Sequence, residues 1–194
     1  MREPMSSAPS VPNGRTADTS IAVWAALLAA LVASLGSLWL TMGMELEACP
    51  LCFYQRTCVM AVVGILGIGL LLRDQNAAGV GAMALPVAAT GLGVGIIHSV
   101  LEYTGKLECP KGIMDIGTAP QQAIVAQAIL VAFLLIAART RVLAAFIALL
   151  MGGAVAWLLF ATSPKPVIPN KAYDGKMIKC RVPYVSPDSQ PPAK

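Results

Sequence analysis

Long runs of apolar residues, separated by short polar connections, make up most of this chain. The first run covers residues 21–44 and contains no charged side chain. An α-helix of about 20 apolar residues is long enough to cross the hydrocarbon core of a bilayer. Four further apolar runs follow: 53–72, 77–101, 123–138 and 142–163. The second contains Arg56 near its start, and the fourth is short, although its uncharged stretch extends back to Ile116. The pattern therefore predicts five transmembrane helices.

The composition supports an integral membrane protein of one domain. Hydrophobic residues make up 57% of the 194 residues and charged residues only 12%, with a mean hydropathy of +0.71. Soluble domains carry about one quarter charged residues. The net charge of +4 does not indicate nucleic-acid binding, because the chain has no basic stripe with interleaved aromatic residues.

The two ends of the chain have a different character from the apolar runs. Residues 1–20 are rich in Ser, Pro, Asn and Thr, and we expect a disordered tail. A cleaved signal peptide is less consistent with the sequence, because the apolar run after this tail is too long and no small-residue cleavage site follows it. Residues 164–194 are rich in Pro and Lys and carry Cys180. We expect an irregular tail, part of which can dock on the rest of the protein.

The third apolar run contains residues that affect helix packing. Pro86 permits a kink, and Gly91, Gly93 and Gly95 permit close approach of a neighbouring helix.

Five spans place the chain termini on opposite sides of the membrane. One side carries five Arg: Arg2, Arg15, Arg73, Arg139 and Arg141. The other side carries eight basic residues: Lys106, Lys111, Lys165, Lys171, Lys176, Lys179, Arg181 and Lys194. This total argues against a cytoplasmic N-terminus. The first span usually dominates, however, and its N-terminal flank has two Arg while its other flank has none. We therefore predict a cytoplasmic N-terminus.

The most reactive motif in the chain is Cys49-Pro50-Leu51-Cys52-Phe53-Tyr54-Gln55-Arg56, between the first two spans. A Cys-x-x-Cys pair can form a readily reduced disulfide, and one of its thiols can have a depressed pKa. If a helix begins near Cys52, Arg56 lies one turn further along the same face. A thiolate at that place would be stabilised by the helix N-terminus and by the cation.

Four of the five cysteines fall on one side of the predicted membrane: Cys49, Cys52, Cys109 and Cys180. Only Cys58 lies within a span. An extended chain from the end of the fifth span to Cys180 reaches roughly 50–60 Å, enough to meet Cys109. Outside the cytoplasm, four such cysteines favour two disulfides. Of the three possible pairings, Cys49–Cys52 with Cys109–Cys180 makes the best chemical sense.

These motifs resemble the DsbB family, bacterial inner-membrane proteins that use quinone to reoxidise a periplasmic thioredoxin-fold oxidase (DsbA-like). The resemblance covers most of the first four spans. It implies an all-α integral membrane protein, a DsbB-like four-helix transmembrane bundle, here with a fifth helix and an irregular tail. It also implies a quinone-dependent protein-dithiol oxidoreductase that uses ubiquinone or menaquinone and no metal. Its partners would be that oxidase, the quinone pool and the bilayer, with no nucleic acid.

The resemblance assigns roles to individual residues. The active disulfide corresponds to Cys49 and Cys52, with Cys52 as the thiolate beside the quinone. Arg56 corresponds to the arginine on the quinone side, and His98 corresponds loosely to a histidine late in the third span. Tyr54 is a candidate wall of the quinone pocket.

The chain departs from the family at its second disulfide, which in the family lies wholly between spans three and four. Here that loop holds only Cys109, and the expected partner, Cys180, follows the extra span. By analogy, the soluble oxidase attacks Cys109 of the Cys109–Cys180 disulfide. The freed thiol then attacks Cys49–Cys52, and two electrons pass to quinone.

Other interpretations remain open on sequence alone. The outer cysteines could form a Cys₄ zinc site of a non-enzymatic protein, although the usual second close pair is missing. A thiol reductant that passes electrons outward would need cysteines reachable from the cytoplasm, and only Cys58 qualifies. A third alternative is an enzyme of the vitamin K epoxide reductase type. In those enzymes the Cys-x-x-Cys lies late in the chain, whereas here it follows the first span. Arg56 could be a snorkelling arginine, His98 a satisfied interfacial side chain and Tyr54 an aromatic-belt residue.

Overall fold

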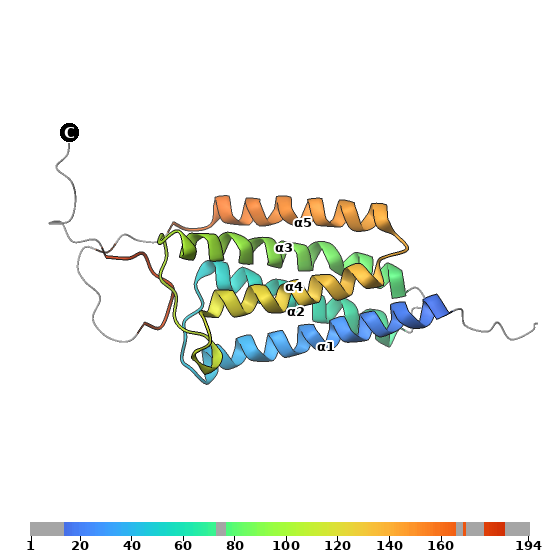
Figure 1. Cartoon of the computed structure of the whole chain (residues 1–194), viewed down its shortest axis with the longest axis horizontal. Coiled ribbons are helices and arrows are strands. Elements are labelled where there is room, and N and C mark those ends of the chain that lie inside the picture. Colours follow the sequence, from blue (N-terminus) through green and yellow to red (C-terminus); the bar gives the residue numbers. More distant parts are fainter. Residues whose placement is uncertain (1–13, 73–76, 166–168, 170–176, 185–194) are drawn as a thin grey trace, which may run out of the picture.

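A computed structural model describes residues 14–72, 77–165, 169 and 177–184. This part of the chain is helical (Figure 1), with five long helices: α1 (Gly14–Met42), α2 (Pro50–Leu71), α3 (Ala77–Tyr103), α4 (Ala119–Ala137) and α5 (Val142–Thr162). One turn of 3-10 helix, η1 (Ile113–Asp115), lies between α3 and α4. Each long helix has the length and apolar composition needed to cross a membrane. The five predicted membrane helices are therefore confirmed.

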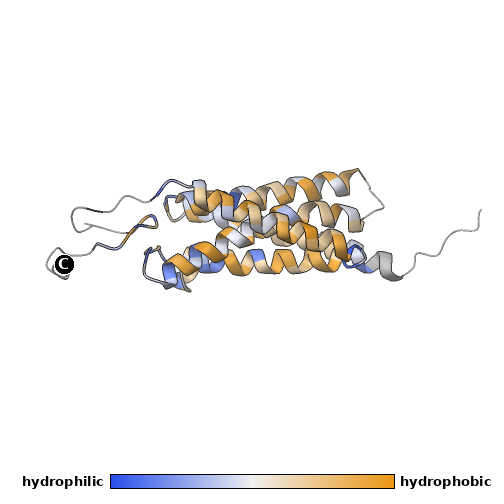
Figure 2. Cartoon of the chain, turned by 90° about the horizontal axis from the view of Figure 1, so that it is seen from above, coloured by the Kyte–Doolittle hydropathy of each residue, from blue (hydrophilic) through white to orange (hydrophobic). Residues whose placement is uncertain are grey.

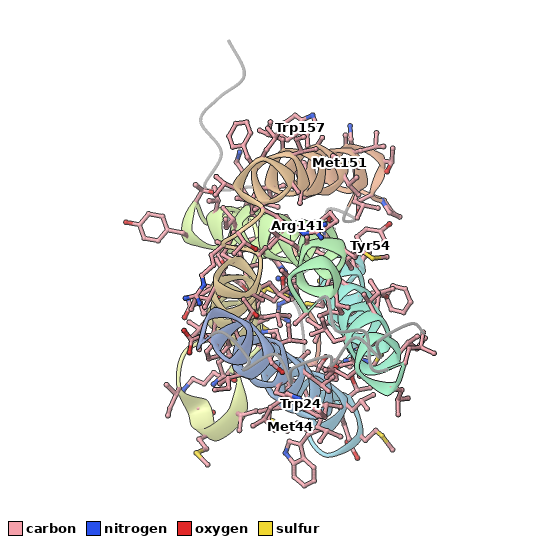
Figure 3. The ribbon with its side chains drawn as sticks, turned by 90° about the vertical axis from the view of Figure 1, so that its right-hand side faces the viewer. Trp24, Met44, Tyr54, Arg141, Met151 and Trp157 are labelled. Atoms are coloured by element: carbon pink, nitrogen blue, oxygen red, sulfur yellow. A yellow bond between two sulfur atoms is a disulfide. The ribbon has the colours of Figure 1, made fainter. Side chains whose placement is uncertain are left out.

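The first four helices form a bundle, and α5 packs along α3 at its edge (Figure 1). The centre of the bundle is filled by aliphatic side chains from α2, α3 and α4, including Val62, Leu66, Leu85, Leu130 and Leu134. The end-on view places α1 with Trp24 and α5 with Trp157 at opposite sides of the bundle (Figure 3). Apolar side chains also cover the outer faces of the helices, while hydrophilic residues gather near the helix ends (Figure 2). This distribution suits a protein surrounded by lipid.

Three helices begin earlier than the sequence indicated, and α2 does so by three residues, at Pro50 instead of Phe53. Helix α1 includes residues 14–20, which we expected in the disordered tail, and residues 1–13 lie outside the described part. Asp18, in this extra turn, forms an ion pair with Arg139 at 3.1 Å. Helix α4 starts at Ala119 because Pro120 suits a first turn and the Gln121 side chain accepts a hydrogen bond from the Thr118 N–H.

The connection between α1 and α2, the α3–α4 loop and the segment after α5 all meet at one end of the bundle (Figure 1). The predicted gathering of Cys49, Cys52, Cys109 and Cys180 at one end is thereby confirmed. Arg139 and Arg141 lie at the opposite end, between α4 and α5. Arg2 and Arg73 lie outside the described residues. The compartment that each end faces remains a prediction.

Small residues bring α5 close to α3. A Cβ added to Gly152 would lie 2.5 Å from the Ala89 Cβ, 2.7 Å from the Pro86 carbonyl oxygen and 2.9 Å from the Thr90 nitrogen. Two of these three atoms belong to the α3 backbone, which cannot move aside as a side chain can. Backbone approach of this kind is a common way for membrane helices to associate.

We therefore expect Gly152→Ala to loosen α5 from α3 and to destabilise the bundle by about 1–3 kcal/mol, the usual cost of overpacking. Gly153→Ala is the matched control, because an added Cβ there meets no atom within 4 Å. Thermal unfolding and limited proteolysis in detergent measure the effect. Equal stability of the two variants would contradict the packing described for Gly152.

Candidate functional site

The N-terminus of α2 positions the Cys-x-x-Cys pair. Cys49 is the N-cap residue, and its sulfur accepts a hydrogen bond from the Cys52 backbone N–H at 3.3 Å. Pro50 occupies the first helical turn, where its missing N–H has no cost. The two sulfur atoms lie 3.1 Å apart, within hydrogen-bond distance of each other. The disulfide predicted here is not formed in this structure, because an S–S bond is about 2.05 Å long.

The pKa of Cys49 reflects this arrangement. The hydrogen bond from the Cys52 thiol, helped by neighbouring His98 and opposed by partial burial, lowers the pKa of Cys49 to about 4. In the dithiol form, this geometry therefore stabilises a thiolate on Cys49. The resemblance assigned the thiolate to Cys52, and that role remains a prediction.

The second pair of cysteines is joined in the predicted manner. Cys109, in the α3–α4 loop, and Cys180 form a disulfide across 71 residues of sequence. Glu108 and Arg181, each next to one of these cysteines, exchange two backbone hydrogen bonds of 2.8 and 2.9 Å. These bonds hold the two segments together beside the disulfide. The part of the tail around Cys180 is thus docked on the loop.

The same segment also docks on the loop between α1 and α2. The Glu47 N–H donates to the Ile178 carbonyl oxygen at 2.8 Å, and Lys179 pairs with the Glu47 carboxylate at 3.0 Å. This second attachment brings Cys180 towards the N-terminus of α2. The Cys180 sulfur consequently lies within 4.8 Å of the sulfurs of both Cys49 and Cys52.

His98, near the C-terminal end of α3, is completely buried among the sulfur atoms. Its Nε2 lies 3.4 Å from the Cys109 sulfur and 3.9 Å from that of Cys49. Its Nδ1 lies 3.9 Å from the Cys52 sulfur. The single histidine of the chain therefore touches both cysteine pairs.

A cavity of about 270 Å³ lies against this cluster. Helices α1, α2 and α4 and the outer loops line it, mostly with aliphatic side chains. Its polar lining residues include Cys52, Arg56, Gln55 and Cys180. Predominantly apolar walls with a few polar groups are typical of small-molecule pockets.

Arg56 reaches the cavity from α2 and is fixed by α1. Its Nε donates to the Ser37 hydroxyl at 2.8 Å, and its Nη2 donates to the Ser37 carbonyl oxygen at 2.9 Å and to the Thr41 hydroxyl. Ser37 and Thr41 are therefore positioning residues, which the sequence analysis missed. Their one-turn spacing on an apolar helix was the available signal.

Two buried amides line the inner part of the cavity. Gln55 on α2 and Gln127 on α4 are each only 3% exposed. The Gln55 Nε2 and the Gln127 Oε1 have no hydrogen-bond partner among the described residues. Buried polar atoms of this kind are costly unless a ligand or solvent satisfies them. Together with the apolar walls, the Gln55 amide N–H and Arg56 fit a flat molecule with acceptor oxygens, such as a quinone head group. The Gln127 oxygen needs a donor, such as a hydroxyl of the reduced form.

The other predicted residues lie elsewhere. Tyr54 packs with Leu51, Val94 and Ala156 on the side of α2 that faces α3 and α5, and it is not among the residues lining the cavity. His98 does not line it either, although it adjoins Cys52. Cys58 is a half-buried free thiol further along α2. Quinone contacts for Tyr54 and His98 therefore stay predictions.

Comparison with known proteins gives consistent results. The sequence model of the family "Disulfide bond formation protein DsbB" matches residues 19–129, more than half of the chain. A probable disulfide formation protein of Coxiella burnetii is 38% identical over 78 residues, covering 40% of this chain and 48% of that protein. No solved structure gives a significant match.

Two further relatives carry similar names. The probable disulfide formation protein C 1 of Bacillus anthracis is 34% identical over 89 residues, covering 46% of this chain and 62% of that protein. The probable disulfide formation protein of Chlamydia trachomatis is 26% identical over 132 residues, covering 63% and 96%. The chain thus spans about half the length of the Coxiella relative and nearly all of the Chlamydia relative.

The family match covers α1, α2, α3 and the first half of α4, and it includes the Cys-x-x-Cys pair, Arg56, His98 and Cys109. Helix α5 and Cys180 lie beyond it. On this match, together with the bundle of membrane helices and the paired cysteines, the chain belongs to the DsbB family of disulfide bond formation proteins.

Proposed function

We propose that this protein is a membrane thiol:quinone oxidoreductase that reoxidises a soluble thioredoxin-fold dithiol oxidase. The observation that carries the proposal is the contact between the two cysteine pairs at one end of the bundle, with a cavity reaching the inner pair. The other end would face the cytoplasm of a bacterium, and the cysteine-bearing end would face the periplasm.

The Cys109–Cys180 disulfide is the acceptor for the soluble partner. A partner thiolate attacks the Cys109 sulfur, the Cys109–Cys180 bond breaks and Cys180 leaves as a thiolate. The partner's second thiol then displaces Cys109, so that the partner departs with a disulfide. The proximity of the Cys180 sulfur to Cys49 and Cys52 supports this order, because the leaving sulfur is the one that faces the inner pair.

Exchange then moves to the inner pair. The Cys180 thiolate attacks the Cys49–Cys52 disulfide, and Cys109 completes the exchange by re-forming its bond with Cys180. The inner pair has now gained two electrons and two protons. His98 can carry protons between the sulfurs, since its ring nitrogens lie 3.4 Å from Cys109 and 3.9 Å from Cys49 and Cys52.

The cavity beside Cys52 would hold ubiquinone or menaquinone. A bound quinone would supply the terminal acceptor for two electrons and two protons. Arg56 would bind one of its oxygens through N–H donors that Ser37 and Thr41 leave available, and Gln55 and Gln127 would line the inner wall. Cys49 lies 3.1 Å from Cys52 as a stabilised thiolate, in position to close the disulfide again.

The proposal is tested by absorbance assays of quinone reduction by the purified protein, with a reduced thioredoxin-fold oxidase as electron donor. We expect turnover with ubiquinone or menaquinone, and its complete loss in Cys52→Ser. Cys58→Ser is the matched control, a free thiol of the same helix outside the cysteine cluster, and should keep wild-type turnover. Absence of turnover with either quinone and with several donors would overturn the proposal.

Replacement of Arg56 by Lys should raise the KM for quinone by roughly 10–100-fold, the equivalent of losing one hydrogen bond from a charged donor. Lys cannot reproduce a guanidinium held by Ser37 and Thr41 while it also donates into the cavity. Lys106→Gln removes a cation from the same end of the bundle, away from the cavity, and should leave the KM unchanged. Similar KM values for both variants would exclude Arg56 from quinone binding.

The lowered pKa of Cys49 predicts the pH dependence of thiol alkylation. Below the ordinary thiol pKa of about 8.5, a free thiol is mostly protonated and reacts slowly. Cys49, with a pKa of about 4, stays ionised as the pH falls to about 5. In chelator-treated, reduced protein at pH 6, iodoacetamide should therefore modify Cys49 well before Cys52, as measured by peptide mass spectrometry. Preferential modification of Cys52 would place the thiolate on the other sulfur.

A further inference from the structure

Four potential metal ligands from three segments of the chain converge at the outer end of the bundle. They are the sulfurs of Cys49, Cys52 and Cys180 and a ring nitrogen of His98, and all four atoms lie within 4.8 Å of one another. Three cysteines and one histidine form one of the common ligand sets of tetrahedral zinc sites. The zinc site that the sequence left open consisted of four cysteines and did not include His98.

The spacing of the four atoms is close to what a metal requires. With Zn–S bonds of about 2.3 Å and Zn–N bonds of about 2.1 Å, ligand atoms of a tetrahedral site lie roughly 3.4–3.8 Å apart. The Cys49 and Cys52 sulfurs lie 3.1 Å apart, the Cys49 sulfur lies 3.9 Å from Nε2 of His98, and the Cys52 sulfur lies 3.9 Å from Nδ1 of the same ring. With one nitrogen of His98 taken as the ligand, no two of the four ligand atoms are more than 4.8 Å apart, so each separation exceeds the tetrahedral range by about 1 Å at most.

The redox state of the protein controls whether this set can bind a metal. In the structure, Cys49 and Cys52 are free thiols, whereas Cys180 is bonded to Cys109. A dithiol that donates two electrons and two protons breaks the Cys109–Cys180 bond and itself becomes a disulfide. Cys180 then supplies the third thiolate, and Cys109 is left outside the four-atom group.

We propose that the fully reduced protein binds one Zn²⁺ through Cys49, Cys52, Cys180 and His98, and that this ion arrests disulfide exchange. Binding displaces the remaining thiol protons and changes no oxidation state. The same four side chains would thus serve electron transfer when they cycle and metal binding when reduction outpaces reoxidation. The inference rests on the proposed function in one respect, the reducibility of the Cys109–Cys180 bond.

Cobalt provides a spectroscopic test that does not depend on turnover. Full-length protein in detergent is reduced with a phosphine under anaerobic conditions and titrated with Co²⁺. We expect one Co²⁺ per chain, with the thiolate charge-transfer band and the intense visible bands of a tetrahedral site, and displacement of cobalt by Zn²⁺. Protein oxidised at both pairs should give no such spectrum.

Variants identify the ligands. Cys180→Ser and His98→Ala should each lose the tetrahedral spectrum, while Cys109→Ser and Cys58→Ser should keep it, because neither sulfur belongs to the four-atom group. The absence of a tetrahedral spectrum in reduced wild type, or an unchanged spectrum in Cys180→Ser, would overturn the proposal. Circular dichroism of the same samples verifies that each variant is folded.

A second measurement separates this inference from the proposed function. Quinone reduction is assayed in chelator-treated buffer and then with Zn²⁺ added to the reduced protein before the quinone. Turnover without metal and its reversible loss with Zn²⁺ support both proposals. If added Zn²⁺ leaves turnover unchanged, the proposed arrest of disulfide exchange is wrong, whereas the oxidoreductase function stands. Absence of turnover in metal-free buffer, together with a tetrahedral cobalt spectrum, overturns the oxidoreductase and leaves the metal site.

Discussion

The site depends on the docking of the C-terminal segment across two loops of the bundle. Glu108 and Arg181 exchange backbone hydrogen bonds, and the Glu47 N–H binds the Ile178 carbonyl oxygen. These bonds are geometrically specific, whereas the ion pair between Lys179 and Glu47 beside them is largely exposed and adds little on its own. Cys180 is placed between two anchoring points, and only this placement brings the second disulfide against the first pair of cysteines.

The remainder of the site follows from how the helices end. Cys49 caps α2, so that its sulfur lies where the first N–H groups of the helix point. His98 comes from α3, one helical turn before that helix ends at Tyr103. The cavity lies between α1, α2 and α4, and Arg56, which lines it, is held by α1. The cysteine cluster and this largely apolar cavity meet at the sulfurs of Cys52 and Cys180.

Much of this arrangement was predictable from sequence, for physical reasons. Long apolar runs of membrane length identify the helices. Because successive spans cross in opposite directions, Cys49, Cys52, Cys109 and Cys180 fall at one end. The start of α4 carried a readable signal in Pro120 and Gln121. The rotation of each helix about its axis was not predictable, because nearly all faces of these helices are apolar. For that reason the sequence does not reveal that Gln127 lines the cavity, that Tyr54 packs with Leu51 and Val94, or that His98 lies among the sulfurs.

Helix α5 has a topological consequence for the chemistry. A bundle that ended after α4 would deliver the following residues to the end of the molecule that holds Arg139, a full membrane thickness away from Cys109. One further crossing returns the chain to the end where the other three outer cysteines lie. Helix α5 lies at the edge of the bundle and outside the part of the chain that matches the family. It allows the segment after it to supply Cys180, one of the two cysteines of the Cys109–Cys180 disulfide.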